Sequence, residues 1–349
     1  MRLDWRGALG IALSALLLWY VLHGQVGEVV KVLATSNLWY WAACTIVATA
    51  IFPLRARRWQ AILTPLAGRI PVKPLWHATA IGMMMNNVFP MRAGEFARAF
   101  AISRERRDVP FTAAFASLAV DRLFDGIVVI ALMLAATLDP RFPADAKVVG
   151  DLGAGDIALS GAAVLGVVLA GLYAFLLFPG VMLGLAERVG SVISPKFGQR
   201  LRGLAEGFTG GLGVLRDARL ALEVTWWTVL HWLTNAFAFY LGFLALGIDA
   251  PFSTACFVQG IVAIGVAVPS SPGFFGIFEA AAAIGLKLYG VDAAFAVSWG
   301  IGFHILSFIP ITVIGAWYFT RLDLHLSDLK TAAASESTAS EPAGSGSAK

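Results

Sequence analysis

The chain has 349 residues, of which 58% are hydrophobic and 14% charged, and its mean hydropathy is +0.76. Soluble globular proteins have about 25% charged and about 45–50% apolar residues, so this composition excludes a soluble globular domain and indicates a polytopic membrane protein. The net charge of +4 is typical of basic cytoplasmic loops and does not predict nucleic-acid binding. Cys44 and Cys256 both lie in apolar stretches, so we expect buried thiols and neither a disulfide framework nor a metal cluster.

Apolar stretches long enough to cross a membrane recur along the chain, since a spanning helix needs about 20 mainly apolar residues. The first one follows Arg2 and Arg6, and we interpret it as a retained signal anchor because no small-residue cleavage site follows it. The six candidate spans are residues 7–24, 37–54, 112–138, 155–178, 222–246 and 295–319.

Two shorter apolar stretches, 75–90 and 253–269, each end at a proline that is soon followed by glycine, and a second helix-like segment comes after each. Proline ends a helix because it lacks a backbone N–H and clashes with the preceding turn. We therefore predict broken, re-entrant helix hairpins at 75–104 and 253–288. The alternative for each is a pair of tight spanning helices.

Loop charges predict the orientation, because cytoplasmic loops are enriched in lysine and arginine. The basic segments "PLRARRW" (53–59) and "SRERRD" (103–108) both become cytoplasmic loops if the first hairpin is re-entrant. The loops 25–36 and 139–154 are then outside, and the basic segment 180–220 is inside. We expect a multi-pass protein of the cell (inner) membrane with cytoplasmic N- and C-termini.

The order span, span, hairpin, span occurs twice, and the second set starts on the opposite side of the membrane. This predicts an all-α fold built as an inverted repeat, whose binding site lies where the broken segments of the two halves meet. Within it, segment 184–220 is either an interfacial amphipathic element or a solvated loop helix. The predicted units are a first membrane half (1–138), an extracytoplasmic loop (139–154), a second membrane half (155–320) and a disordered cytoplasmic tail (321–349).

The stretch "AIGMMMNNVFPMRAGEFARAF" (80–100) places ionisable groups beside a helix break. Irregular backbone at membrane depth must face protein or a watery cavity, and a helix that starts there points its positive dipole end inward. Arg92, Glu95 and Arg98 are three residues apart and share roughly one helix face, where the arginines could bind a phosphate and Glu95 could pair with them or carry a proton. The alternative is a salt-bridge ladder at the membrane surface. Candidate residues with a structural or a binding role in the break itself are Asn86, Asn87, Pro90 and Gly94.

The stretch "LAVDRLFDGIVV" (118–129) puts Asp121, Arg122 and Asp125 about three turns into a predicted span. Charges at that depth are costly and mark a transport pathway, a proton relay or a paired structural network. Pairing of either aspartate with Arg92 or Arg98 would favour the structural alternative.

The stretch "PSSPGFFGIFE" (269–279) has the same proline, glycine and glutamate character. We predict that backbone amides at Ser270, Ser271 and Gly273 form the counterpart of the first site, and that Glu279 has a functional role on the return helix. For His231 and His304, which lie within predicted spans, we expect hydrogen-bonded interior residues.

These three motifs, in this order and spacing, resemble the flippase-like membrane family of the lysylphosphatidylglycerol synthase transmembrane region; Asp121–Arg122 stands where Glu-Arg is frequent in that family. The resemblance covers about residues 7–320 and implies a stand-alone member without the aminoacyl-transfer domain. It implies movement of a lipid or lipid-linked head group across the bilayer. The residues to which it carries over are Asn87, Pro90, Gly94, Glu95, Arg98, Asp121, Arg122, Pro269, Pro272, Gly273, Gly276 and Glu279.

We therefore expect a lipid flippase or transporter that works by alternating access on an anionic or phosphate-bearing lipid. The sequence has no G-x-x-x-x-G-K-[ST] motif, so we expect no ATP-driven step and no cofactor, and proton coupling is one source of energy. The alternatives are an integral-membrane enzyme acting on lipid, such as a transferase, and a secondary transporter of a small solute.

Overall fold

The computed structural model describes residues 26–89, 92–149, 152–267 and 272–324, together with Leu16, Trp19, His23 and Gly24. Most of the predicted first span (7–24) and of the predicted tail (321–349) therefore lies outside the described residues. The same holds for the predicted site residues Pro90, Ser270 and Ser271, and for Pro269.

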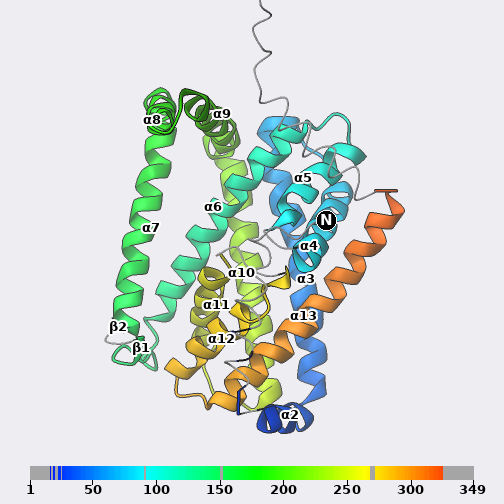
Figure 1. Ribbon diagram of the computed structural model, residues 1–349, viewed down its shortest axis with the longest axis vertical. Coiled ribbons are helices and arrows are strands. Elements are labelled where there is room, and N and C mark those ends of the chain that lie inside the picture. Colours follow the sequence, from blue (N-terminus) through cyan, green and yellow to red (C-terminus); the bar gives the residue numbers. More distant parts are fainter. Residues whose placement is uncertain are drawn as a thin grey trace, which may run out of the picture.

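Helices make up nearly all of this part of the chain, as predicted (Figure 1). A small antiparallel pair, β1 (Lys147–Val149) and β2 (Leu152–Gly153), lies within the predicted loop 139–154. The helices are α2 (Val26–Ala34), α3 (Leu38–Ala67), α4 (Val72–Val88), α5 (Ala93–Glu105), α6 (Phe111–Ala136), α7 (Ala154–Leu177), α8 (Pro179–Ser191), α9 (Pro195–Gly211), η1 (Leu212–Arg216), α10 (Ala218–Leu246), α11 (Phe252–Ala267), η2 (Pro272–Phe274), α12 (Ile277–Leu288) and α13 (Ala293–Arg321).

Four stretches are long and apolar enough to span a bilayer by length and composition: α3, Leu159–Leu177 of α7, α10 and α13. Helix α6 has 26 residues, about 39 Å at about 1.5 Å per residue, and it carries three charged side chains near its middle. The described residues thus form a multi-pass bundle of long apolar helices. The predicted spans 112–138, 155–178, 222–246 and 295–319 correspond to α6, α7, α10 and α13.

Both predicted hairpins consist of two short helices joined at a break. Helices α4 and α5 have 17 and 13 residues, and α11 and α12 have 16 and 12, all fewer than the roughly 20 that a span requires. Figure 1 shows α4 and α5 in the upper half of the bundle and α11 and α12 in the lower half. Helices α4 and α5 approach closely at two glycines, since a Cβ on Gly94 would collide with the Gly82 carbonyl oxygen and with the Asn86 side chain.

Among the described residues two large apolar cores lie toward the two ends of the bundle, and a small third cluster joins Phe52, Ala80 and Ile311. One contains Trp299, Phe243 and neighbouring residues of α10 to α13, and the other contains Trp59, Ile102 and their neighbours on α3 to α6. Helices α3, α6 and α10 contribute to both cores. On each of these three helices a polar residue lies between its two apolar portions, namely Arg55, Asp125 and His231. A polar layer therefore separates the two cores.

Two sequence interpretations were wrong. The segment 53–59 is not a cytoplasmic loop, because α3 continues through Pro53 to Ala67 and buries Arg58 completely. Arg55 and Arg58 are compatible with a helix interior because acidic side chains of α6 pair with them, as described below, whereas Arg57 is exposed. The segment 25–36, predicted as a loop, is mostly helical, since α2 occupies Val26–Ala34.

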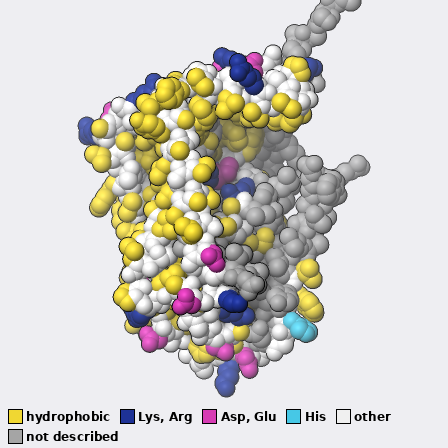
Figure 2. All heavy atoms as spheres, turned by 90° about the vertical axis from the view of Figure 1, so that its left-hand side faces the viewer, with side chains coloured by type: hydrophobic (Ala, Val, Ile, Leu, Met, Phe, Trp, Pro, Cys, Tyr) yellow, Lys and Arg dark blue, Asp and Glu magenta, His cyan; other side chains and the backbone are white. Residues whose placement is uncertain are grey.

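The segment 184–220 forms the end of α8, then α9 and η1. Figure 2 shows the side of the molecule on which α7 lies, with apolar side chains along its length and basic side chains gathered near the end that carries α8 and α9. No residue of the apolar stretch of α7 is buried within the protein, as expected of a helix whose surroundings are lipid. The same view shows charged side chains in a recess at mid-height.

Candidate functional site: a buried arginine and carboxylate network

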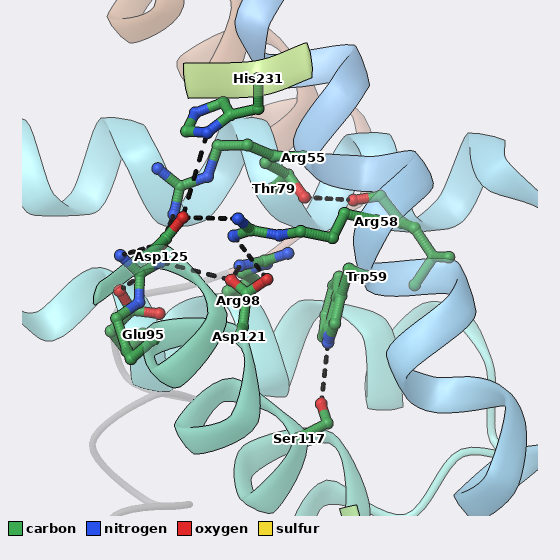
Figure 3. Close-up of polar contacts among 12 residues, drawn as sticks. Arg55, Arg58, Trp59, Thr79, Glu95, Arg98, Ser117, Asp121, Asp125 and His231 are labelled. Atoms are coloured by element: carbon green, nitrogen blue, oxygen red, sulfur yellow. Dashed lines mark hydrogen bonds and ion pairs between the residues drawn. The ribbon is translucent and has the colours of Figure 1, made fainter. Parts of the chain in front are cut away.

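The polar layer is a network of charged side chains where α3, α5, α6 and α10 meet (Figure 3). Its acidic members are Glu95, Asp121 and Asp125. Its basic members are Arg55, Arg58, Arg98 and Arg122, and His231 and Trp232 of α10 complete it on one side.

Asp121 is the fully buried centre of the network. Its Oδ1 lies 2.6 Å from Arg58 Nη2, and its Oδ2 accepts a hydrogen bond of 3.0 Å from Arg98 Nη1. Arg98 also lies over the ring of Trp59, with its Cζ atom 4.0 Å from the ring centroid, a cation–π contact. Trp59 is held in turn by a 2.8 Å hydrogen bond from its Nε1 to Ser117 Oγ. Asp121, Arg98 and Trp59 therefore each have two partners that fix their side chains.

Asp125, one helical turn after Asp121, joins three helices. Arg58 Nη1 donates to its Oδ1 over 2.5 Å, and Trp232 Nε1 donates to the same oxygen over 2.9 Å. Arg122 Nη1 lies 3.1 Å from Oδ2. His231 Nδ1 is 4.0 Å from Oδ1 and has no hydrogen-bond partner among the described residues.

The network opens toward the surface at Arg122 and Glu95. Their ion pair is 3.3 Å long, and the two side chains are 35% and 23% exposed, whereas Asp121 is not exposed at all. A ligand that reaches the network from outside the bundle would therefore meet these two residues first.

Positive charge exceeds negative charge in the network by one, because four arginines face three carboxylates. Several buried guanidinium nitrogens have no hydrogen-bond partner within the described residues, among them Arg98 Nε and Nη2, Arg55 Nε and Arg122 Nε. An unpaired buried donor costs about 1–3 kcal/mol, and more when charged. The donor set fits a further anion, and phosphate or carboxylate oxygens match its planar geometry.

The breaks of the two hairpins touch each other beside this network. Arg92 has a left-handed backbone (φ 55°), and its Nη2 donates over 2.6 Å to the Val266 carbonyl at the end of α11. Its guanidinium lies 5.7 Å from the ring centroid of Phe274 in η2. Arg92 therefore joins the first hairpin to the second and is not part of the ion-pair network.

The two asparagines have separate structural contacts. Asn86 Oδ1 accepts a 2.8 Å hydrogen bond from the Gly94 backbone N–H, so one of the free donors at the start of α5 is already used. Asn87 Nδ2 donates to Thr312 Oγ1 over 2.7 Å and ties α4 to α13.

Glu279 is buried in the second hairpin and caps α12. Its Oε2 accepts a 2.6 Å hydrogen bond from the Gly276 backbone N–H, and its Oε1 lies 2.6 Å from His304 Nδ1. His304 is thus a hydrogen-bonded interior residue, as expected. Gly273 is close by, and its carbonyl oxygen lies 2.7 Å from His304 Nε2.

The structure brings together five of the predicted site residues, Glu95, Arg98, Asp121, Arg122 and Asp125, while Gly273 and Glu279 belong to a separate cluster. Arg92, Glu95 and Arg98 do not form a ladder of their own, because Arg98 pairs with Asp121 and Glu95 with Arg122. The pairing of Arg98 with Asp121 is the contact that favours a structural role for Asp121.

Sequence reasoning missed Arg55 and Arg58, which it placed in a loop, and did not connect His231 and Trp232 to Asp125. The signal for the arginines was the pair of aspartates at 121 and 125, because such a pair within a span requires basic partners.

Comparisons with known proteins identify relatives of the chain. Among curated proteins, one named "Glycosyltransferase AglD" from Haloferax volcanii is 29% identical over 284 residues, which are 74% of this chain and 45% of the relative. A "UPF0104 membrane protein" from Methanothermobacter thermautotrophicus is 24% identical over 323 residues, 88% of this chain and 89% of the relative. The chain thus spans less than half of the first relative, and no solved structure is detectably similar. Residues 7–315 match the family model of the lysylphosphatidylglycerol synthase TM region, and the chain belongs to this family.

Proposed function

We propose that the protein moves an anionic lipid, or the phosphate-bearing head group of a lipid-linked molecule, across the bilayer without using ATP. The observation that carries the proposal is the surplus of buried arginine in the network. Four guanidinium groups face three carboxylates, and buried N–H groups of these arginines have no partner among the described residues. A phosphate would supply both the negative charge and the acceptors.

The position of the network favours an amphiphilic cargo over a small soluble one. The network lies between two apolar cores, and its exposed edge is Arg122, on a helix next to the lipid-facing α7. A lipid could hold its head group at Arg122 while its acyl chains stay in the surrounding hydrocarbon. A sugar or an ion without an apolar part would make no favourable contact with the apolar cores or with the surrounding hydrocarbon.

Alternating access is the mechanism that we propose for the movement. The two halves, 1–138 and 155–320, each contribute a hairpin, and Arg92 joins their breaks through Val266. Breaking this contact and remaking it would expose the network first to one leaflet and then to the other, as in transporters with inverted repeats. In this proposal the protein lies in the inner membrane with both termini cytoplasmic.

The test is lipid exchange in proteoliposomes, followed with a membrane-impermeant quencher. Labelled phosphatidylglycerol is the anionic probe and labelled phosphatidylcholine the zwitterionic one. We expect protein-dependent exchange of the anionic lipid, reduced about tenfold or more in Arg122→Gln, because a hydrogen bond to a charged group contributes about 1.5–3 kcal/mol. Arg106→Gln is the matched control, since Arg106 is in a loop and pairs with Asp108.

Equal exchange in Arg122→Gln and wild type would overturn the site assignment, and absence of exchange for every lipid would overturn the function. The melting temperature of each variant in the same lipid shows whether loss of exchange is loss of folding.

A membrane transferase is the second candidate, and the name of the relative from Haloferax volcanii, a glycosyltransferase, favours it. Asp121 and Asp125 would then have to serve a reaction, although arginines engage both carboxylates. Transfer of a radiolabelled sugar from a nucleotide-activated donor to lipid, by the purified protein, would support this candidate. Lipid exchange without any transfer would exclude it.

A further inference from the structure

The contacts of His304 require a proton between it and Glu279. The Gly273 carbonyl oxygen can only accept, so His304 Nε2, 2.7 Å away, must carry a hydrogen and donate it. His304 Nδ1 lies 2.6 Å from Glu279 Oε1, and this contact also needs a hydrogen. The pair is therefore either imidazolium with carboxylate or imidazole with carboxylic acid. Both forms hold one proton more than the imidazole–carboxylate pair, and both have no net charge.

Loss of that proton breaks one of the two contacts. A neutral imidazole has a single N–H, and hydrogen bonds to an ionised carboxylate are stronger than those to a neutral carbonyl. The remaining hydrogen therefore goes to Nδ1 and Glu279, and the bare Nε2 faces the lone pairs of the Gly273 oxygen. Gly273 is then released, the pair has a net charge of −1, and the proton leaves to water.

Aromatic and apolar groups surround the pair. The ring centroids of Phe275 and Phe278 lie 4.3 and 4.6 Å from that of His304, in stacked and tilted arrangements, and Phe308 makes an edge-type contact at 6.2 Å. The face of an aromatic ring attracts a cation. Glu279 is 1% exposed, so an uncompensated carboxylate there would be costly. The packed elements present mainly apolar groups: Phe239 of α10 contacts Phe278, and Gly265 of α11 contacts Ile277 and Ala281.

Release of Gly273 would act on the contact between the two hairpins. Gly273 has a left-handed backbone (φ 65°) and packs beside Asn87 of α4. The next residue, Phe274, lies under the guanidinium of Arg92, which is the charged group that the first hairpin presents to this break. The same arginine donates to Val266, so a movement of η2 changes its surroundings directly.

We propose that Glu279 and His304 form a proton-binding site that holds η2 against the first hairpin when protonated and releases it when the proton leaves. The evidence for the proton site is the geometry of the contacts that Glu279 and His304 make. Its coupling to lipid movement rests on the proposed function.

Hydrogen–deuterium exchange of the backbone amides of residues 273–276, in nanodiscs over a range of pH and corrected for intrinsic exchange, tests the site. In the wild type we expect protection to fall about tenfold across a one-proton transition as pH rises, the size expected for loss of one buried hydrogen bond. In Glu279→Gln the protection of these backbone amides should stay high at every pH. The glutamine side-chain NH₂ donates to His304 Nδ1, so the single hydrogen of the neutral imidazole stays on Nε2 and donates to the Gly273 carbonyl oxygen. Glu105→Gln is the matched control: it alters a second histidine–carboxylate pair, His77–Glu105, and should keep the wild-type transition.

A wild-type profile without a transition, or a transition that persists in Glu279→Gln, would overturn the proposal. The ¹⁵N resonances of His304 in the wild type give an independent test if that variant fails to fold. They should change with pH to a neutral form protonated at Nδ1, and a form protonated only at Nε2 throughout would also overturn it.

The coupling has a separate readout. Lipid exchange should depend on pH in the wild type and lose that dependence in Glu279→Gln, and retention of the dependence would overturn the coupling. If no variant moves lipid, the proposed function fails, while the amide-exchange result still decides the proton site.

Discussion

Arg58 and Asp121 form an ion pair of 2.6 Å between Nη2 and Oδ1, and neither side chain is exposed. Two charges removed from water in this way are stable only with good geometry and further hydrogen bonds. Arg58 also donates to Asp125, and Asp121 also accepts from Arg98. The pair is therefore the centre of the polar layer, because Arg58 and Asp121 each also bind a second charged residue of the network.

Removal of Arg58 should be strongly destabilising. We expect Arg58→Ala to lower the free energy of unfolding by about 3–5 kcal/mol, because it leaves buried carboxylates short of their partner. Titration with a denaturing detergent in mixed micelles measures this. Arg106→Ala, in an exposed pair with Asp108, should cost less than about 1 kcal/mol. Equal stability of the two variants would mean that the network is not buried as described.

The close approach of α4 and α5 leaves no room for a methyl group on Gly94. We expect Gly94→Ala to cost about 1–3 kcal/mol, since the new Cβ would collide with the Gly82 carbonyl and the Asn86 side chain. Gly166→Ala in α7 is the control, because a Cβ there would meet nothing within 4 Å, and alanine raises helix propensity by up to about 1 kcal/mol. Unfolding in detergent compares them, and a neutral Gly94→Ala would show that the two helices separate readily.

Asn87 and Thr312 should be energetically coupled, because their hydrogen bond is 2.7 Å long and joins α4 to α13. A double-mutant cycle of Asn87→Ala and Thr312→Val should give about 0.6 kcal/mol, and at most about 1.7 kcal/mol, as found for such bonds in membrane proteins. A cycle of Asn87→Ala with the exposed Thr225→Val provides the reference, and its effects should add. Additive effects in the first cycle would contradict the contact.

Asp139 should give the fold an acid-sensitive contact outside the spans. Hydrogen bonds from Ser253 Oγ (2.6 Å) and from the Arg141 backbone N–H (2.8 Å) lower the pKa of Asp139. Because the folded pKa is lower than the unfolded value of about 3.9, this stabilisation is complete above that value and is lost as pH falls through the folded pKa.

The measurement is a ¹³C carboxyl titration of Asp139. Its pKa should rise in Ser253→Ala and stay low in Ser253→Thr, which keeps the hydroxyl group. An unchanged pKa in Ser253→Ala would assign the shift to another cause.

Helix positions were predictable because they follow from local properties of the chain. Apolar length identified α6, α7, α10 and α13 within a few residues, and proline followed by glycine identified the breaks of both hairpins. Partners in space were not predictable in this way. Arg58 pairs with a residue 67 positions later, and Trp232 with one 107 positions earlier.

The composition of segment 53–59 was misleading, because its partners are distant in the sequence. Three arginines within 53–59 resemble a cytoplasmic loop, but the aspartates of α6 pair with Arg55 and Arg58, and Arg57 is exposed. Likewise, Glu279 and His304 each stood alone in the sequence, and only packing of α12 on α13 makes them a pair.

The wide separation of Arg58 from its partners also determines the order in which the protein can be assembled. A ribosome completes α3 long before α6, so Arg58 has neither of its carboxylates when it first reaches the membrane. Burial of the guanidinium before α6 arrives would leave an unpaired charge in an apolar setting. Helix α3 can therefore reach its final depth only together with α6, and the polar layer is a late product of biogenesis.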